Sequence, residues 1–330
     1  IVSSNIKKIY FYRLINYVLN KIKIKEKILF LIFKKKKLIF NNKYSVENKI
    51  FVVDHLYYKK LFFFHLIFKH QIYNNNCKII SIPAGLPLYV KHPKEWDKAK
   101  NEISIISNKY DKVGIQHQYW LDELKIIPKF NSKRAKILGA PRYTKEWINE
   151  LDSFTPMDNQ PLDFTGVKIV YMAANSTDHI NFHEKKKETI EMVSNLPNVK
   201  LIYKPHPRSN LKYTIFPKNV INGKNYLSTN LINWADIIIG EISAIMIEVI
   251  LKKKIYISLK YLRNQDTEMI YERYKCCEIA NSINDLKSQI LNLKNYDYSS
   301  KKTSIEKFYK DIVLNNSKDL LEEYSNFINE

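Results

Sequence analysis

A histidine between two prolines is the most distinctive chemical feature of the sequence, in the stretch "KPHPR". Pro205 and Pro207 restrict the backbone on either side of His206, and Lys204 and Arg208 place a positive charge at each end. Cations beside an imidazole favour its neutral form and attract phosphate groups. The pattern predicts an anion-binding site, with a structural histidine at a strand end as the alternative.

A second candidate site lies in "ADIIIGEISAIMIEVILKK", residues 235–253, which is typical of a strand, a tight turn and a helix. We expect the first turn of the helix to include Ser243 and Ala244. The N–H groups at a helix N-terminus are unpaired and bind phosphate. Ser243 would then donate to a diphosphate, or it is an ordinary N-cap.

Two carboxylates in the same stretch are candidate acceptors for ribose hydroxyls. Glu241 follows the strand, and Glu248 is expected about two turns into an otherwise apolar helix. Solvated side chains are the alternative for both residues.

The first half of the chain holds a candidate general base, His117, in the loop stretch "GIQHQYW". If two domains face each other, this imidazole can meet a donor across a cleft and take the proton of an acceptor hydroxyl. A structural or surface histidine is the alternative.

Three further residues lie at predicted strand ends. Arg142, in "GAPRY", is a candidate phosphate ligand or an interdomain salt bridge. Asn175 and Ser176, in "MAANSTDH", follow small residues that allow a close backbone approach to a ligand, or they belong to a polar loop.

Several common chemistries lack their motifs. The chain has only six glycines, and they form neither a GxGxxG fingerprint nor a Walker loop. There is no DxD or HExxH motif and no convincing Ser/His/Asp set, so no metal is implied. The three cysteines lack metal-ligand spacing, which indicates structural thiols in a reduced cytoplasmic protein.

The elements that position these residues are clearest in the second half. Apolar segments alternate with helical patterns there, which predicts a parallel sheet covered on both faces. The expected strands are "VKIVYMAAN" (167–175), "VKLIYKPH" (199–206), "ADIIIGE" (235–241) and "KIYISL" (254–259). The expected fold class is therefore α/β, with a Rossmann-like domain in the second half.

The predicted organisation has four parts. Residues 1–150 form an acceptor-side α/β domain, and residues 151–166, rich in turn formers, form a linker. Residues 167–300 form the nucleotide-donor domain, and residues 301–330 form a tail of one or two amphipathic helices.

The formal charge of +21 indicates an anionic partner, although the lysine-rich composition also resembles AT-rich coding drift. Lysine runs such as "FKKKK" (33–37) predict docking on anionic inner-leaflet lipid. No apolar run reaches the roughly 20 residues that a membrane helix needs. The expected location is cytoplasmic, with peripheral membrane contact.

Taken in order, five motifs resemble the CDP-glycerol glycerophosphotransferase family and related capsule or surface-glycan transferases of GT-B architecture. They are "QHQ" (116–118), "APRY" (140–143), "AANS" (173–176), "KPHPR" (204–208) and "GEISA" (240–244). The resemblance covers roughly residues 110–260 and implies a GT-B-like α/β fold, in which two Rossmann-like domains face a cleft. Three departures are Gln118 in place of a glycine, Arg208 in place of a second histidine, and Glu241 with Ile242 in place of Asp-Tyr. The "HPR" form is closer to transferases of capsule, lipopolysaccharide and sialic-acid type.

The resemblance implies that His117 is the base and that His206, Arg208 and Ser243 hold the donor phosphates. The implied reaction is displacement of a nucleoside phosphate by a hydroxyl of a glycan or glycolipid acceptor. Fixed dipoles and cations would stabilise the leaving group without a metal. The donor, CMP- or CDP-linked, would be a substrate, and no cofactor is implied.

Three alternative functions remain open. One is a CDP-polyol phosphotransferase proper, and another is a sugar-nucleotide epimerase of GT-B shape. The third is a non-enzymatic nucleic-acid-binding protein, which would need its basic residues gathered on one face. The lysines are spread through the chain, which argues against nucleic acid as a partner.

Overall fold

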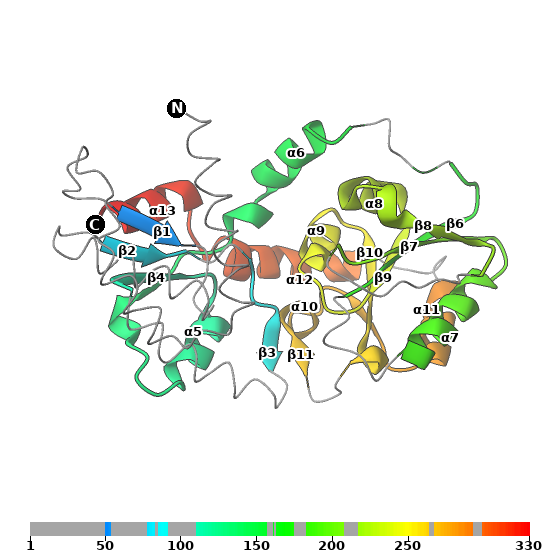
Figure 1. Ribbon diagram of the computed structural model, residues 1–330, viewed down its shortest axis with the longest axis horizontal. Helices are drawn as coiled ribbons and strands as arrows, with labels where there is room; N and C mark the ends of the chain where they lie inside the picture. Colours follow the sequence, from blue (N-terminus) through cyan, green and yellow to red (C-terminus); the bar gives the residue numbers. More distant parts are fainter. Residues whose placement is uncertain are drawn as a thin grey trace, which may run out of the picture. The chain divides into compact units, whose positions relative to one another are not determined.

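A computed structural model describes residues 50–53, 78–82, 85–91, 110–156, 161, 163–174, 183–207, 217–263, 267–292 and 299–330 (Figure 1). The lysine run at 33–37 and the helical stretch expected near 93–109 lie outside the described residues. No helix within the described ranges is both long and apolar enough to span a bilayer.

The first sheet has four parallel strands in the order β1-β2-β4-β5. They are β1 (Ile50–Val53), β2 (Lys78–Ser81), β4 (Lys112–Ile115) and β5 (Ala135–Ile137). Helix α5 (Gln118–Lys125) packs against it through Trp120 and Leu124. Single 3-10 turns follow at Ser132–Arg134 and Pro141–Tyr143, and helix α6 covers Lys145–Ser153.

The second sheet has six parallel strands in the order β12-β10-β9-β6-β7-β8. They are β6 (Val167–Met172), β7 (Val199–Lys204), β8 (Val220–Asn222), β9 (Ile237–Gly240), β10 (Ile255–Leu259) and β12 (Glu278–Ala280). The predicted strands of the second half are thus confirmed, each one to three residues shorter than expected.

Helices cover both faces of the second sheet because its strands are apolar on both sides. In β6, Ile169 and Tyr171 point into one core, and Val170 and Met172 point into the other. Helices α7 (His183–Ser194) and α11 (Ile283–Leu291) lie side by side on the first of these cores (Figure 1). The opposite core includes α8 (Ser228–Trp234), α9 (Ile245–Leu251) and α10 (Ile270–Arg273).

The tail is helical, as predicted, and it returns to the first sheet. It consists of α12 (Ser299–Phe308), a π-helical turn (Tyr309–Val313) and α13 (Leu320–Asn329). Phe327 of α13 packs on Ile80 and Leu138, and Figure 1 shows α13, in red, beside the strands of this sheet. We call the first sheet with α5 and α13 the first lobe, and the second sheet with α7 to α12 the second lobe.

One short ribbon was not predicted. Strand β3 (Tyr89–Lys91) pairs antiparallel with β11 (Glu268–Met269), a contact between segments from the two halves of the chain. Helix α6 also extends into the segment expected to be a linker, since it ends at Ser153. The division of the chain into four parts remains a prediction.

Candidate functional site

Three adjacent strands of the second sheet end in the same row. Met172 of β6 is in register with both Lys204 of β7 and Gly240 of β9. The residues that follow these strands therefore emerge at one carboxyl edge, which is where open α/β sheets bind ligands. His206 and Glu241 both lie at this edge, as expected.

Lys204 binds the neighbouring loop. Its Nζ atom donates to the carbonyl oxygens of Lys224 and Tyr226, at 3.2 and 2.6 Å, and burial lowers the pKa of this lysine. His206 is half-buried beside it, while Arg208 lies outside the described residues. Lys204 thus fixes the loop at residues 224–226 next to His206.

Glu241 forms a buried ion pair. Its Oε1 atom is ion-paired with Lys186 Nζ at 2.7 Å and accepts a hydrogen bond from the Tyr171 hydroxyl at 2.8 Å. The Glu241 and Lys186 side chains are only 1% and 4% exposed, so the alternative of a solvated carboxylate is wrong. Within the described part of the chain, Oε2 accepts no hydrogen bond. Burial and the nearby carboxylate raise the pKa of Tyr171.

The turn after β9 differs from the expectation. Helix α9 begins at Ile245 with Ala244 as its N-cap, and no side chain caps it. Ser243 precedes that N-cap and is half-buried; its carbonyl accepts from the Met246 N–H at 3.2 Å. The prediction that Ser243 belongs to the first helical turn or caps it is therefore wrong.

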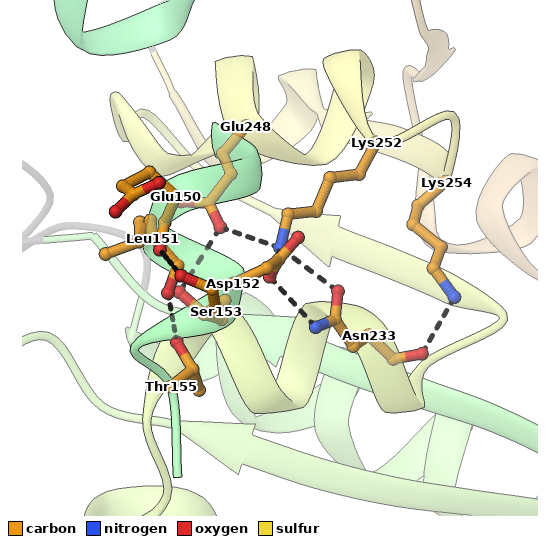
Figure 2. Close-up of polar contacts among 10 residues, drawn as sticks. Glu150, Leu151, Asp152, Ser153, Thr155, Asn233, Glu248, Lys252 and Lys254 are labelled. Carbon is orange, nitrogen blue, oxygen red and sulfur yellow. Dashed lines mark hydrogen bonds and ion pairs between the residues drawn. The ribbon is translucent and has the colours of Figure 1, made fainter. Parts of the chain in front are cut away.

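Glu248 lies one turn into α9, not two, because the helix starts later than expected. It is buried, and its Oε1 is 3.3 Å from Lys252 Nζ (Figure 2). It also accepts a hydrogen bond from Thr229 at 3.3 Å. Burial raises the pKa of Glu248, and Lys252 opposes that shift. The carboxylate expected to be solvated or to meet ribose is thus held inside a polar cluster.

Figure 2 shows Lys252 at the centre of this cluster. Its Nζ atom is also 2.5 Å from Asp152 Oδ1 and donates to Asn233 Oδ1 at 3.1 Å. Nearby, Lys254 Nζ donates to the Asn233 carbonyl oxygen at 2.9 Å. These contacts fasten the end of α6 to α8 and α9.

His117 is completely buried and is the N-cap of α5. Its Nδ1 accepts from the Trp120 N–H at 3.1 Å, so the proton of the neutral ring sits on Nε2, which donates to the Pro87 carbonyl at 2.9 Å. Burial lowers the pKa of His117 to about 4. Both ring nitrogens are engaged in this arrangement, and the role of His117 as a base remains a prediction.

The remaining predicted residues are dispersed. Arg142 is exposed in the 3-10 turn at Pro141–Tyr143. Asn175 and Ser176 lie outside the described residues, directly after the buried Ala173 and Ala174. Across the described ranges, no group of three His, Cys, Asp or Glu residues could hold a metal ion.

Lys186 and Lys252 were not singled out from the sequence. Lys186 stands in the run "KKK" at 185–187, where its neighbours are exposed. One signal was present: Lys186, Ile190 and Val193 share helical spacing, and all three are buried in α7. A lysine on the apolar stripe of a helix points to a buried partner.

No family model and no curated protein sequence matches the chain. Among solved structures, the wall teichoic acid polymerase TagF, as a histidine-to-alanine variant, is similar with a TM-score of 0.53 and 13% identity, over 94% of this chain and 98% of that chain. A histidine-to-asparagine variant of TagF soaked with CDPG has a TM-score of 0.51 and 14% identity, over 84% and 70%.

A UDP-GlcNAc 2-epimerase from Methanocaldococcus jannaschii, in complex with UDP-GlcNAc and UDP, is similar with a TM-score of 0.51 and 11% identity, over 83% of this chain and 77% of that chain. At these identities the likeness concerns the fold. The chain has a GT-B-like α/β fold with helices at its C-terminal end.

Proposed function

We propose that the chain is a transferase that moves a glycosyl or polyol-phosphate group from a nucleotide-activated donor to a hydroxyl of a bacterial surface glycan. One observation carries the proposal: in a GT-B-like fold, His206 and the turn at residues 241–244 emerge at the same carboxyl edge of the second sheet. A pyrophosphate group at that edge would meet the imidazole of His206 and the backbone of the turn.

In this proposal, His206, Arg208 and Ser243 contact the donor phosphates, and Asn175 and Ser176 follow the strand beside them. The free oxygen of Glu241 is an acceptor for a donor hydroxyl, with Lys186 and Tyr171 fixing the carboxylate. The leaving nucleoside phosphate is stabilised by these dipoles and cations.

The base of the proposed reaction is His117, which has to exchange its present bonds before it can take a proton. Its Nε2 atom carries the ring proton while Nδ1 accepts from the Trp120 N–H. An acceptor hydroxyl must therefore displace the Pro87 carbonyl, and the ring must change tautomer.

A nucleotide thermal-shift panel tests the donor assignment. We expect one of CMP, CDP, UDP or GDP at millimolar concentration to raise the Tm, and His206→Ala to abolish that shift. Lys287→Ala, on the exposed side of α11, is the matched control and should keep it. The donor site is wrong if no nucleotide stabilises the protein, or if His206→Ala responds like the parent chain.

An epimerase is the second candidate function, because the UDP-GlcNAc 2-epimerase has the same TM-score, 0.51, as the soaked TagF variant. The two functions differ in their need for an acceptor. Incubation with UDP-GlcNAc alone, followed by NMR of the sugar ring, separates them: conversion to the C2 epimer without an acceptor favours the epimerase.

A further inference from the structure

A segment of the first half of the chain, residues 85–91, is built into the second lobe. We call this segment the strap. Near its start, Gln116 Nε2 donates to the Gly85 carbonyl and His117 Nε2 donates to the Pro87 carbonyl. At its end, β3 pairs with β11, and the Ile270 N–H donates to the Leu88 carbonyl at 2.7 Å.

The strap contributes side chains to the core of the second lobe. Leu86 is buried in the same cluster as Ile270 and Tyr271 of α10. Leu88, Tyr89 and Val90 pack against this cluster as well, so removing the strap would expose apolar surface.

A second contact lies beside the strap. The guanidinium of Arg273 sits 5.9 Å from the centre of the Tyr119 ring, and Tyr119 also meets Tyr274 edge-on at 6.4 Å. Arg273 is itself paired with Glu268 of β11. Helix α5 of the first lobe thus reaches the element that holds the strap.

Away from the strap, the chain passes from one lobe's core to the other at two points. Leu138 belongs to the first-lobe core and Ala140 to the second; Val313 belongs to the second and Phe327 to the first. The two crossings are bonded to each other, since the Ala140 N–H donates to the Val313 carbonyl at 2.8 Å.

The backbone at these crossings is unusual. Gly139 has a φ of +76°, and a Cβ there would lie 2.4 Å from the Val313 carbonyl oxygen. Asn315 and Asn316 have φ values of 49° and 57°, directly after the π-helical turn. Element ends of this kind absorb the dihedral changes of a hinge.

We propose that the strap is a releasable latch, which holds the two lobes together and keeps His117 engaged, and that the crossings at residues 138–140 and 313–316 are the hinge. The paired ribbon is the smallest sheet among the described residues, since β11 has only 2 residues and β3 has 3, and a ribbon of two short strands adds little stability by itself. When the strap is released, His117 Nε2 loses its bond to the Pro87 carbonyl. The two lobes can then move apart, with the crossings as the hinge.

A disulfide staple across the ribbon tests the latch in the full chain. Lys91 and Glu268 are directly paired, and opposed residues of an antiparallel ribbon lie about 4.5–5.5 Å apart, within disulfide range. The variant is Lys91→Cys with Glu268→Cys in a Cys77→Ser background, and the single Lys91→Cys chain is the control. Cys276 and Cys277 are buried.

Amide hydrogen exchange gives a readout that needs no ligand. In the reduced double variant we expect the strap and β11 amides to exchange at least tenfold faster than those of β6, and oxidation to slow them at least tenfold. Equal exchange in the oxidised and reduced chains would overturn the latch, because the ribbon would then be permanently closed.

The consequence for ligand access is measured with the stabilising nucleotide from the thermal-shift panel. We expect its on-rate to fall at least tenfold in the oxidised chain and to recover with reductant. An unchanged on-rate would overturn the requirement for release. If no nucleotide binds, the donor assignment fails, and hydrogen exchange still decides the latch.

A gentler variant guards against misfolding of the stapled chain. Arg273→Ala removes the contacts to Tyr119 and Glu268 at a side chain that is 45% exposed. We expect strap exchange to become several-fold faster while the exchange of β6 is unchanged, and Lys287→Ala to have no effect. Unchanged strap exchange in Arg273→Ala would contradict the latch.

Discussion

At the scale of single residues, the protein buries two oppositely charged pairs of side chains and one uncharged imidazole, that of His117. Glu241 with Lys186 and Arg263 with Glu272 are ion pairs at nearly complete burial. Removing one partner of such a pair leaves an uncompensated charge, which is far more costly than removing an exposed pair. His117 avoids this cost because it stays uncharged.

The depressed pKa of His117 makes stability depend on pH. Its pKa is about 4 in the folded chain and 6.5 for an unperturbed imidazole, so between these values the unfolded chain binds more protons. Stability therefore falls as the pH falls from 6.5 to 4, by up to about 1.4 kcal/mol per pH unit from this group.

His117→Asn isolates the effect, because asparagine is a good N-cap that does not titrate. Urea denaturation at pH 7 and pH 5 should show the parent chain losing its stability advantage over the variant at the lower pH. A stability difference that is the same at both values would contradict the buried, neutral imidazole.

The types of these residues were predictable from the sequence, but their partners were not. "KPHPR" marked His206 as a strand-end histidine, and the structure places it at the expected edge. Glu241 and Lys186 are paired although they are 55 residues apart in the sequence. Helical and strand periodicity relates only residues that are close in sequence, so it could not predict this pairing. Likewise, the bond between His117 and Pro87 depends on the path of the strap.

At the scale of elements, α6 is fastened to the second lobe through Lys252. The ammonium group of this lysine lies between Asp152 of α6 and Glu248 of α9 (Figure 2). Its side chain is only 8% exposed, so Lys252 serves as the counter-ion for the buried Glu248.

Lys252→Met should therefore be strongly destabilising. It leaves Glu248 buried without its cation, at a cost of about 3 kcal/mol. Adding Glu248→Gln to Lys252→Met should recover part of that loss, because the uncompensated charge is removed. Lys287→Met is the exposed control, and urea denaturation at pH 7 measures all four chains. A double variant no more stable than Lys252→Met would argue against the pairing.

Long apolar strands were the easiest elements to predict. β6, β7, β9 and β10 were found to within a few residues, because burial on both faces gives continuous apolar runs. β3 and β11 have too few residues for any pattern, and their pairing was missed. The start of α9 was misplaced because Ser243 resembles an N-cap and the actual N-cap is Ala244.

At the scale of the whole molecule, the covering of the first sheet depends on the tail. Phe327 is 3% exposed and packs against Ile80 and Leu138, and Lys112 Nζ donates to its carbonyl oxygen at 3.0 Å. A helical tail was predicted from its amphipathic pattern, but the surface it covers was not, since periodicity does not name a partner.

Phe327→Ala should destabilise the first lobe by about 3–5 kcal/mol. Hydrogen exchange should rise in β2, β4 and β5 and stay unchanged in β6 and β9. Leu321→Ala is the matched control on the same helix, because Leu321 is 73% exposed. Equal effects of the two substitutions, or a rise spread over both sheets, would contradict local packing by α13.

The return of α13 also sets an order of events during synthesis. The ribosome completes β5 at residue 137 long before it reaches Leu320, so one apolar face of the first sheet waits for its cover while the rest of the chain emerges. The strands of the second sheet, the last of which ends at Ala280, are also synthesised before α13. A nascent chain of this protein therefore offers chaperones an uncovered sheet until α13 has emerged.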